Sequence, residues 1–177
     1  MRKRILNLTY IAIGAALMAM CAWITIPIGP VPFTMQTFAV LTVAGIFGWK
    51  RAVLSVLVYM ALGAIGAPVF SGFGSGIGVL AGVTGGYIVG FVLTAWTVGW
   101  AADRSRRTLP LALSMVAGIF LCYVFGTIWY LWIYTRSTGA VGLLSVLSVC
   151  VFPYILPDLF KAALALFLIK RLRKYIK

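Results

Sequence analysis

Long apolar runs most constrain what this chain can fold into. Of its 177 residues, 63% are hydrophobic and 10% are charged, whereas about a quarter of the residues in a soluble domain are charged. A helix that crosses a bilayer needs roughly 20 consecutive apolar residues. The chain is therefore expected to be an all-α, multi-pass membrane protein.

Six runs are expected to form transmembrane helices, with glycine, proline and short charged clusters at most of the breaks. They are residues 5–26, 31–49, 52–68, 82–102, 109–135 and 156–169. The two shortest are expected to be tilted, buried inside the bundle or next to re-entrant segments. Residues 136–155 are apolar enough for a seventh crossing, but Pro153 and Pro157 interrupt them. We expect a loop and a helix along the outer surface there, within one domain over residues 1–177.

The basic residues favour six crossings over seven. With both termini on one side, this topology collects all of the 15 basic residues there except Arg136 and Lys161. An excess of lysine and arginine marks the cytoplasmic face, so both termini are expected in the cytoplasm. A seventh crossing would move the basic C-terminal cluster to the outside. Because the charges sit at helix ends and form no stripe, nucleic acid is not an expected partner.

The chain has few side chains of the kinds that carry out catalysis or bind metals. It contains no histidine and only two acidic residues, Asp103 and Asp158. Its three cysteines are scattered through apolar surroundings without metal-ligand spacing. General acid–base catalysis and metal chemistry therefore lack their usual groups, and we expect neither an enzyme nor a metal or other cofactor.

Two irregular segments are expected to meet on the outer face. Residues 24–38 hold three prolines, which forbid a continuous helix. Residues 63–90 hold ten of the 19 glycines. Spacing by four at Gly82, Gly86 and Gly90 favours close helix packing, whereas the irregular glycines of 70–78 favour a loop that closes over a ligand. The six-helix topology predicts a small-molecule pocket at that end.

Asp158 and Lys161 are an unusual charged pair in the last apolar run. Residues three apart lie on one face of a helix. A charge at the bilayer centre costs about 2.5–3.5 kcal/mol on insertion scales, so such residues usually mark a function. The alternative is a mutual ion pair that contacts no ligand, although buried pairs are weak stabilisers.

Three stretches carry a family resemblance: "IPIGPVPFTMQTFAV", "YMALGAIGAPVFSGFGSGIGVLAGVTGGYIVGF" and "FPYILPDLFKA". In this order they resemble the BioY family, the biotin-binding S components of energy-coupling-factor (ECF) transporters, with a likeness from about residue 12 to residue 170. The resemblance implies the six-helix ECF S-component fold in the cell membrane. It also implies capture of biotin outside and delivery inward, together with a transmembrane coupling protein and cytoplasmic ATPase subunits.

The resemblance also implies a set of site residues. Asp158 and Lys161 match the charged residues of the family's ligand site, an outer lid is expected at residues 33–36, and the glycine segment 72–87 is expected to wrap the ligand ring. Some family members add an asparagine and an arginine from mid-chain; this chain has no asparagine except Asn7 and no arginine between Arg51 and Arg104. Ser75 and Tyr87 are the expected substitutes. The full expected set is Phe33, Thr34, Gln36, Ser75, Gly85, Gly86, Tyr87, Asp158 and Lys161.

The first helix is expected to dock on the coupling protein through small residues, as the resemblance implies. They are Ala12, Ala15, Ala16 and Ala19, for which packing inside the chain is the alternative. Three other functions stay open: an S component for another water-soluble vitamin, a membrane scaffold in which Asp158 and Lys161 are structural, and a disfavoured intramembrane enzyme. The oligomeric state, a homo-oligomer included, and the group that contacts the biotin carboxylate are left open as well.

Overall fold

The computed structural model describes residues 2–139 and 142–175. Within these residues the chain forms α-helices, one short 3₁₀ turn and one two-stranded hairpin. The elements are α1 (Arg2–Trp23), β1 (Thr25–Ile26), β2 (Phe33–Thr34), α2 (Gln36–Phe47), α3 (Trp49–Ala64), η1 (Ser71–Phe73), α4 (Ile77–Ala81), α5 (Gly85–Arg104), α6 (Thr108–Thr138), α7 (Leu143–Cys150) and α8 (Phe152–Leu172).

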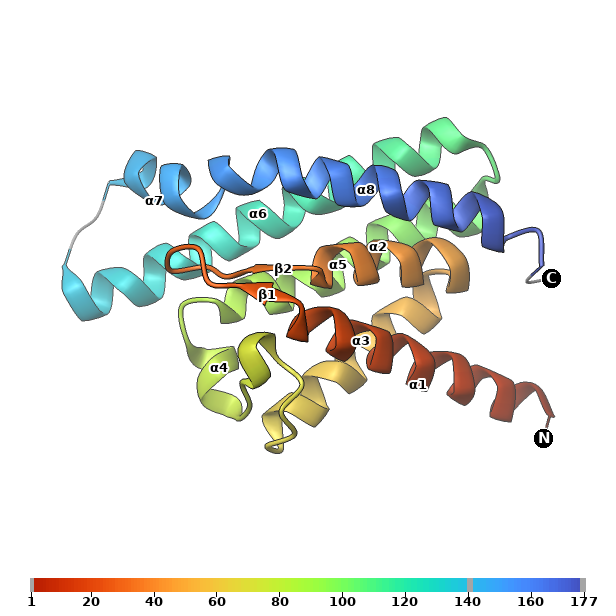
Figure 1. Cartoon of the computed structure of the whole chain (residues 1–177), viewed down its shortest axis with the longest axis horizontal. Coiled ribbons are helices and arrows are strands. Elements are labelled where there is room, and N and C mark those ends of the chain that lie inside the picture. The colour runs from red at the N-terminus through yellow and green to blue at the C-terminus, as the bar shows by residue number, and fades with distance from the viewer. Residues whose placement is uncertain (1, 140–141, 176–177) are drawn as a thin grey trace.

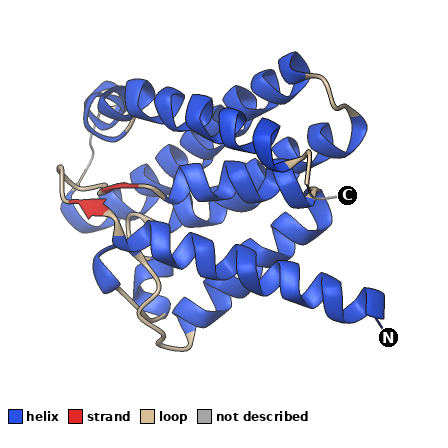
Figure 2. Ribbon diagram, turned by 45° about the vertical axis from the view of Figure 1, so that its right-hand side comes forward, coloured by secondary structure: helices blue, strands red, loops and turns tan. Residues whose placement is uncertain are grey.

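The helices form a bundle whose two ends differ. Both termini lie at one end, while the hairpin, α4 and α7 lie toward the other (Figure 1). The antiparallel hairpin pairs Thr25 with Thr34 and Ile26 with Phe33, and it projects beside the helices (Figure 2). The most extensive helix–helix interface is the one between α5 and α6. The irregular segments predicted to meet at one end therefore do so.

In the described part of the chain, four helices are long and apolar enough to cross a membrane: α1, α5, α6 and α8. The other two predicted crossings are shorter, since α2 has 12 residues and α3 has 16. Both fall below the roughly 20 residues that a spanning helix needs. In α2 the central residues Ala39, Val40 and Leu41 are at most 1% exposed, so this helix is buried inside the bundle. Of the two runs predicted to be shortest, 52–68 forms the short α3, whereas 156–169 belongs to α8, which has 21 residues.

Two helices in proline-containing segments start at other residues than predicted. The 31–49 run becomes helical only at Gln36, because its first residues form the end of the hairpin. Conversely, α8 already begins at Phe152, with Pro153 in its first turn and Pro157 inside it. An N-terminal turn has unpaired N–H groups, so Pro153 removes no hydrogen bond. The prediction that 136–155 is a loop followed by a surface helix was wrong at both ends, since 136–138 continue α6 and 152–155 belong to α8.

Glycines bring α5 and α6 into close contact. A Cβ atom at Gly86 would strike the Trp129 side chain, and one at Gly90 would meet Cys122 at 3.0 Å. Small residues allow membrane helices to approach in this way. The packing interpretation therefore holds for Gly86 and Gly90, whereas Gly82 precedes α5 and accepts a 3.0 Å hydrogen bond from Trp129 Nε1 at its carbonyl.

Asp103, one of the two acidic residues, joins helix ends near the termini. Its Oδ2 accepts a 3.2 Å hydrogen bond from the backbone N–H of Trp49 at the start of α3. Gly48, which links α2 to α3, has φ +78°, and a Cβ there would strike the Asp103 carboxylate. A glycine is thus required at this turn both by its left-handed backbone and by the nearby carboxylate.

Candidate functional site

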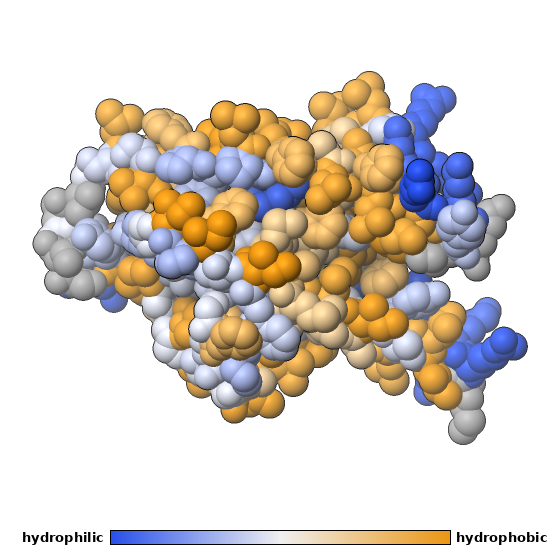
Figure 3. Space-filling view, viewed as in Figure 1, coloured by the Kyte–Doolittle hydropathy of each residue, from blue (hydrophilic) through white to orange (hydrophobic). Residues whose placement is uncertain are grey.

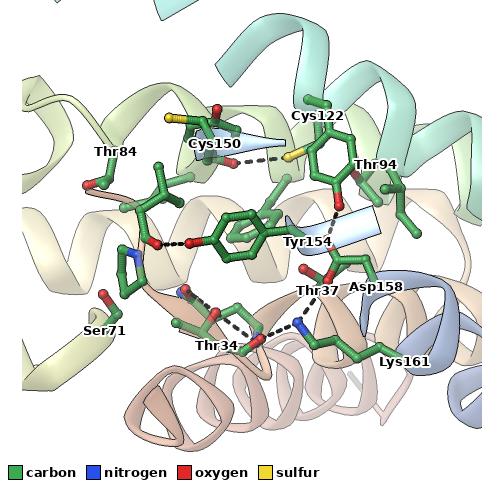
Figure 4. A pocket seen from close by; sticks show the side chains of 18 residues that line it. Thr34, Thr37, Ser71, Thr84, Thr94, Cys122, Cys150, Tyr154, Asp158 and Lys161 are labelled. Atoms are coloured by element: carbon green, nitrogen blue, oxygen red, sulfur yellow. Dashed lines mark hydrogen bonds and ion pairs between the residues drawn. The ribbon is translucent and has the colours of Figure 1, made fainter. Parts of the chain in front are cut away.

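A cavity lies among the hairpin, α2, α5, α6, α7 and α8. Side chains that line it come from all six of these elements and from the loops before α4 and α5 (Figure 4). The lining residues are Val31, Pro32, Thr34, Gln36, Thr37, Ser71, Thr84, Tyr87, Ile88, Phe91, Thr94, Ile119, Cys122, Tyr123, Cys150, Tyr154, Asp158 and Lys161.

Asp158 and Lys161 form a buried ion pair in this cavity. The Lys161 Nζ lies 2.8 Å from the Asp158 Oδ1, and Lys161 and Asp158 are 3% and 6% exposed, respectively. One helical turn separates them on α8, as their spacing predicted. Charged residues are almost never this buried unless they are paired, so the pairing accounts for the burial of both.

The second oxygen of the Asp158 carboxylate is held from another helix. The Tyr123 hydroxyl on α6 donates a hydrogen bond of 2.5 Å to Oδ2. A hydrogen bond to an ionised acceptor is roughly twice as strong as a neutral one. The carboxylate is therefore fixed between α6 and α8, with both oxygens toward the cavity wall that Tyr123 and Lys161 share.

The Lys161 ammonium links α8 to the hairpin. Besides its bond to Asp158, Nζ donates a 2.6 Å hydrogen bond to the Thr34 carbonyl. It also lies 3.9 Å from the centre of the Phe33 ring, within the range of a cation–π contact. An ammonium has three donors, so these two hydrogen bonds leave one N–H for a further acceptor.

A second polar group on the cavity wall centres on Gln36, the first residue of α2. Its Nε2 donates to the Tyr59 hydroxyl of α3 at 2.5 Å, and its Oε1 accepts from the Thr34 hydroxyl at 3.1 Å. The Gln36 backbone N–H also donates to the Thr34 hydroxyl at 3.3 Å. These bonds fix the end of the hairpin to α2 and α3.

Tyr154 ties the turn of the hairpin to α8. Its hydroxyl contacts the carbonyl of Val31 and lies 2.7 Å from that of Ile28. Asp158 follows one turn later on the same helix face. The hairpin is thus attached to α8 at two places, through Tyr154 at its turn and through Lys161 at Thr34.

The structure brings together five of the predicted ligand residues. Thr34, Gln36, Tyr87, Asp158 and Lys161 all line the cavity, and Phe33 lies against the Lys161 ammonium.

The other three lie outside the lining. Ser75 is exposed in the loop before α4. Gly86 packs against Trp129, and a Cβ at Gly85 would strike the Leu80 carbonyl, so close packing accounts for both glycines.

The four alanines predicted to dock on a partner divide between two faces of α1. Ala15 and Ala19 are buried inside the chain, at 3% and 8% exposure. This agrees with the alternative that these alanines pack against the rest of the chain. Ala12 and Ala16 are exposed. Only this second pair, four residues apart, is accessible to another protein.

Sequence reasoning missed Tyr123, Tyr154 and Tyr59. Tyr154 precedes Asp158 by four residues, so the helical period could have placed it on the same face. Tyr123 and Tyr59 carry no comparable signal, because a tyrosine within an apolar helix fits lipid-facing and buried positions equally well.

Known proteins resemble this chain over nearly its whole length. The model of the BioY family matches residues 1–177. The "Biotin transporter BioY" of Thermotoga maritima is 39% identical over 162 residues, which cover 92% of each chain. The "Probable biotin transporter BioY" of Pyrococcus horikoshii is 35% identical over 94% of this chain and 96% of its own. A crystal structure of the S-component for biotin from an ECF-type ABC transporter has a TM-score of 0.84 and 28% identity, with 99% of this chain and 98% of that chain covered.

Proposed function

This chain belongs to the BioY family, and we propose that it is the biotin-capturing S component of an ECF-type transporter. In this role it binds biotin from the outside and releases it inward, and the protein is a transport subunit rather than an enzyme. The observation that carries the proposal is the buried Asp158–Lys161 pair, which lies in a cavity enclosed by several helices and the hairpin.

Biotin offers groups that complement this cavity. Its ureido head has two N–H donors and one carbonyl acceptor, and its tail ends in a carboxylate. Asp158 is suited to accept from the ureido N–H groups, and the free donor of Lys161 is suited to a carbonyl or a carboxylate. Ile88, Phe91 and Ile119 provide apolar contacts for the ring and the aliphatic chain.

Binding is proposed to widen the cavity. Its volume in this structure is about 80 Å³, whereas pockets for small molecules usually measure roughly 300–1,000 Å³. The hairpin is the wall that we propose to move: its contacts with α8 include the hydrogen bonds of Tyr154 and Lys161, which can break and re-form. We therefore propose that residues 24–36 act as the lid over the ligand.

The membrane topology that we propose has six crossings, formed by α1, α2, α3, α5, α6 and α8, with both termini in the cytoplasm of a cell-membrane protein. The termini share one end of the bundle (Figure 1). Strongly hydrophilic residues also gather at that end, whereas apolar residues predominate over the middle (Figure 3). The positive-inside rule supports this orientation, and the whole chain then acts as a single domain.

The proposed partners are a transmembrane coupling protein and cytoplasmic ATPase subunits. The matching crystal structure is that of an S-component from an ECF-type ABC transporter, which supports a role beside other transporter subunits. The exposed face of α1 at Ala12 and Ala16 is the proposed contact with the coupling protein, since small residues allow close helix approach in a membrane.

Ligand identity tests the proposal most simply. Purified protein should carry biotin, identified by mass spectrometry of the released small molecule. In a panel of biotin, thiamine, riboflavin and pantothenate, only biotin should bind tightly. Preferential binding of another vitamin would assign the chain to a different substrate, and binding of none would favour a scaffold.

A further inference from the structure

A second cleft opens at the end of the bundle that holds both termini. The ends of α2, α5 and α8 and the start of α6 surround it, and its volume is about 630 Å³, within the usual range of roughly 300–1,000 Å³ for ligand pockets. It is separate from the cavity around Asp158. The lining residues are Gly45, Ile46, Gly48, Ala102, Asp103, Arg106, Thr108, Leu111, Leu166, Ile169, Lys170, Arg173 and Lys174.

The charge in this cleft is strongly unbalanced. Arg106, Lys170, Arg173 and Lys174 line it, and Asp103 is the one carboxylate among its lining residues. That carboxylate already accepts a hydrogen bond from the Trp49 backbone. The cleft therefore holds an excess of positive charge that no side chain of its lining neutralises.

Backbone carbonyls of two other helices anchor the Arg173 side chain in the cleft. Its Nη2 and Nε donate to the Gly45 carbonyl at 2.7 and 3.0 Å, and Nη2 also reaches the Ala102 carbonyl at 3.2 Å. Burial lowers the pKa of Arg173, as does the charge of Arg106, while Asp103 raises it. Arg106 and Arg173 line the same cleft, so an anion bound there would be attracted by two guanidinium groups.

Aliphatic side chains line the cleft beside its cations. They are Ile46, Leu111, Leu166 and Ile169, of which Ile46 and Leu166 are partly exposed and can contact a ligand. Orientation in the membrane accounts for basic residues at this end, but it does not require four of them to converge on one cleft beside aliphatic side chains. The combination suits an amphiphile with an anionic head.

We propose that this cleft binds the phosphate group of an anionic membrane lipid. Arginine pairs with phosphate through two parallel hydrogen bonds, and basic pockets between transmembrane helices are suited to lipid head groups on the cytoplasmic side. The apolar wall receives the start of the acyl chains, which favours a lipid over a free phosphate compound. A bound lipid would then join the ends of α2, α5, α6 and α8.

Native mass spectrometry of the full chain tests this proposal. The protein is incorporated into nanodiscs of phosphatidylcholine with a minor fraction of phosphatidylglycerol and then released, and the retained lipids are counted. The test variant is Arg106→Gln with Lys174→Gln, which changes exposed residues and leaves the bonds of Arg173 intact. The matched control is Arg2→Gln with Arg4→Gln, which removes the same charge from exposed positions of α1.

Wild-type protein and the α1 control should retain one phosphatidylglycerol in preference to phosphatidylcholine. In the cleft variant, the affinity for this lipid should fall by about fivefold for each charge removed. Equal losses in both variants would overturn the proposal, because only general surface charge would then act. Equal retention of phosphatidylcholine, or displacement of the lipid by millimolar glycerol phosphate, would also overturn it. A cleft variant that keeps its lipid but no longer binds a protein partner would overturn the proposal as well, because the cleft would then be a protein-binding site.

Discussion

The Tyr123 hydroxyl donates a 2.5 Å hydrogen bond to Oδ2 of Asp158 and thereby joins α6 to α8 at the cavity. Lys161 binds the other carboxylate oxygen at 2.8 Å. The acid is therefore oriented from two sides. An oriented acceptor suits a ligand with paired N–H donors, because the carboxylate itself then need not reorient on binding.

Tyr123→Phe should weaken biotin binding without unfolding the protein. The change removes one donor to a charged group, a bond worth about 1.5–3 kcal/mol, so biotin affinity measured by calorimetry should fall by about tenfold or more. Tyr130→Phe is the matched control, since Tyr130 is also buried in α6 but lies outside the cavity lining. Unchanged affinity in Tyr123→Phe would show that the hydrogen bond from α6 to the Asp158 carboxylate does not contribute to biotin binding.

Tyr154→Phe should speed the release of biotin. The hydroxyl contacts the carbonyls of Ile28 and Val31, and its loss frees the turn of the proposed lid. Neutral hydrogen bonds contribute about 1 kcal/mol, so the dissociation rate of labelled biotin should rise by about fivefold. Tyr175→Phe, at a position 83% exposed, should release biotin at the wild-type rate. If both variants release biotin equally, the hairpin is not the lid.

Gly86→Ala should destabilise the bundle. Its new Cβ would strike the Trp129 side chain at the α5–α6 interface, and overpacking typically costs about 1–3 kcal/mol. The thermal unfolding midpoint in detergent should therefore fall. Gly78→Ala is the control, because no atom lies within 4 Å of a Cβ there. An unchanged midpoint in Gly86→Ala would contradict the packing role.

Leucine substitutions on α1 should separate docking from packing. Ala12→Leu with Ala16→Leu adds bulk to exposed positions, so the coupling protein should no longer co-purify while biotin binding persists. Ala15→Leu overpacks a position that is 3% exposed and should lower stability by about 1–3 kcal/mol. Co-purification that survives the exposed double change would place the docking face elsewhere.

Much of the fold could be predicted from the sequence because apolar runs and their breaks are direct signals of membrane helices. The shared helix face of Asp158 and Lys161 could also be predicted, since the helical period alone puts residues three apart on one face. The shortness of α2 and α3 could not be, because the apolar residues continue beyond the helices, into the hairpin before α2 and into the segment after α3, where Ile65 is 80% exposed. The early start of α8 was missed because Pro153 and Pro157 were interpreted as breaks, although the helix accommodates both.

The site was less predictable than the fold. The three prolines of 24–38 indicated a stiff loop, yet nothing in them specified a hairpin of two-residue strands. Tyr123 lies 35 positions before Asp158, and only the packing of α6 on α8 brings the two together. Gly85 and Gly86 belong to a glycine-rich stretch in which packing and ligand contact give the same pattern, and only the neighbouring Leu80 and Trp129 distinguish them.

The dissociation constant for biotin in Asp158→Asn, compared with wild type and with Asp103→Asn, tests the central claim most directly. The neutral amide would remove the charged acceptor proposed for the two ureido N–H groups, and a hydrogen bond to a charged group is worth about 1.5–3 kcal/mol. Biotin affinity should therefore fall by at least about a hundredfold. Asp103→Asn removes the chain's other acid far from the cavity and should bind biotin as the wild type does. Wild-type affinity in Asp158→Asn would contradict the proposed site.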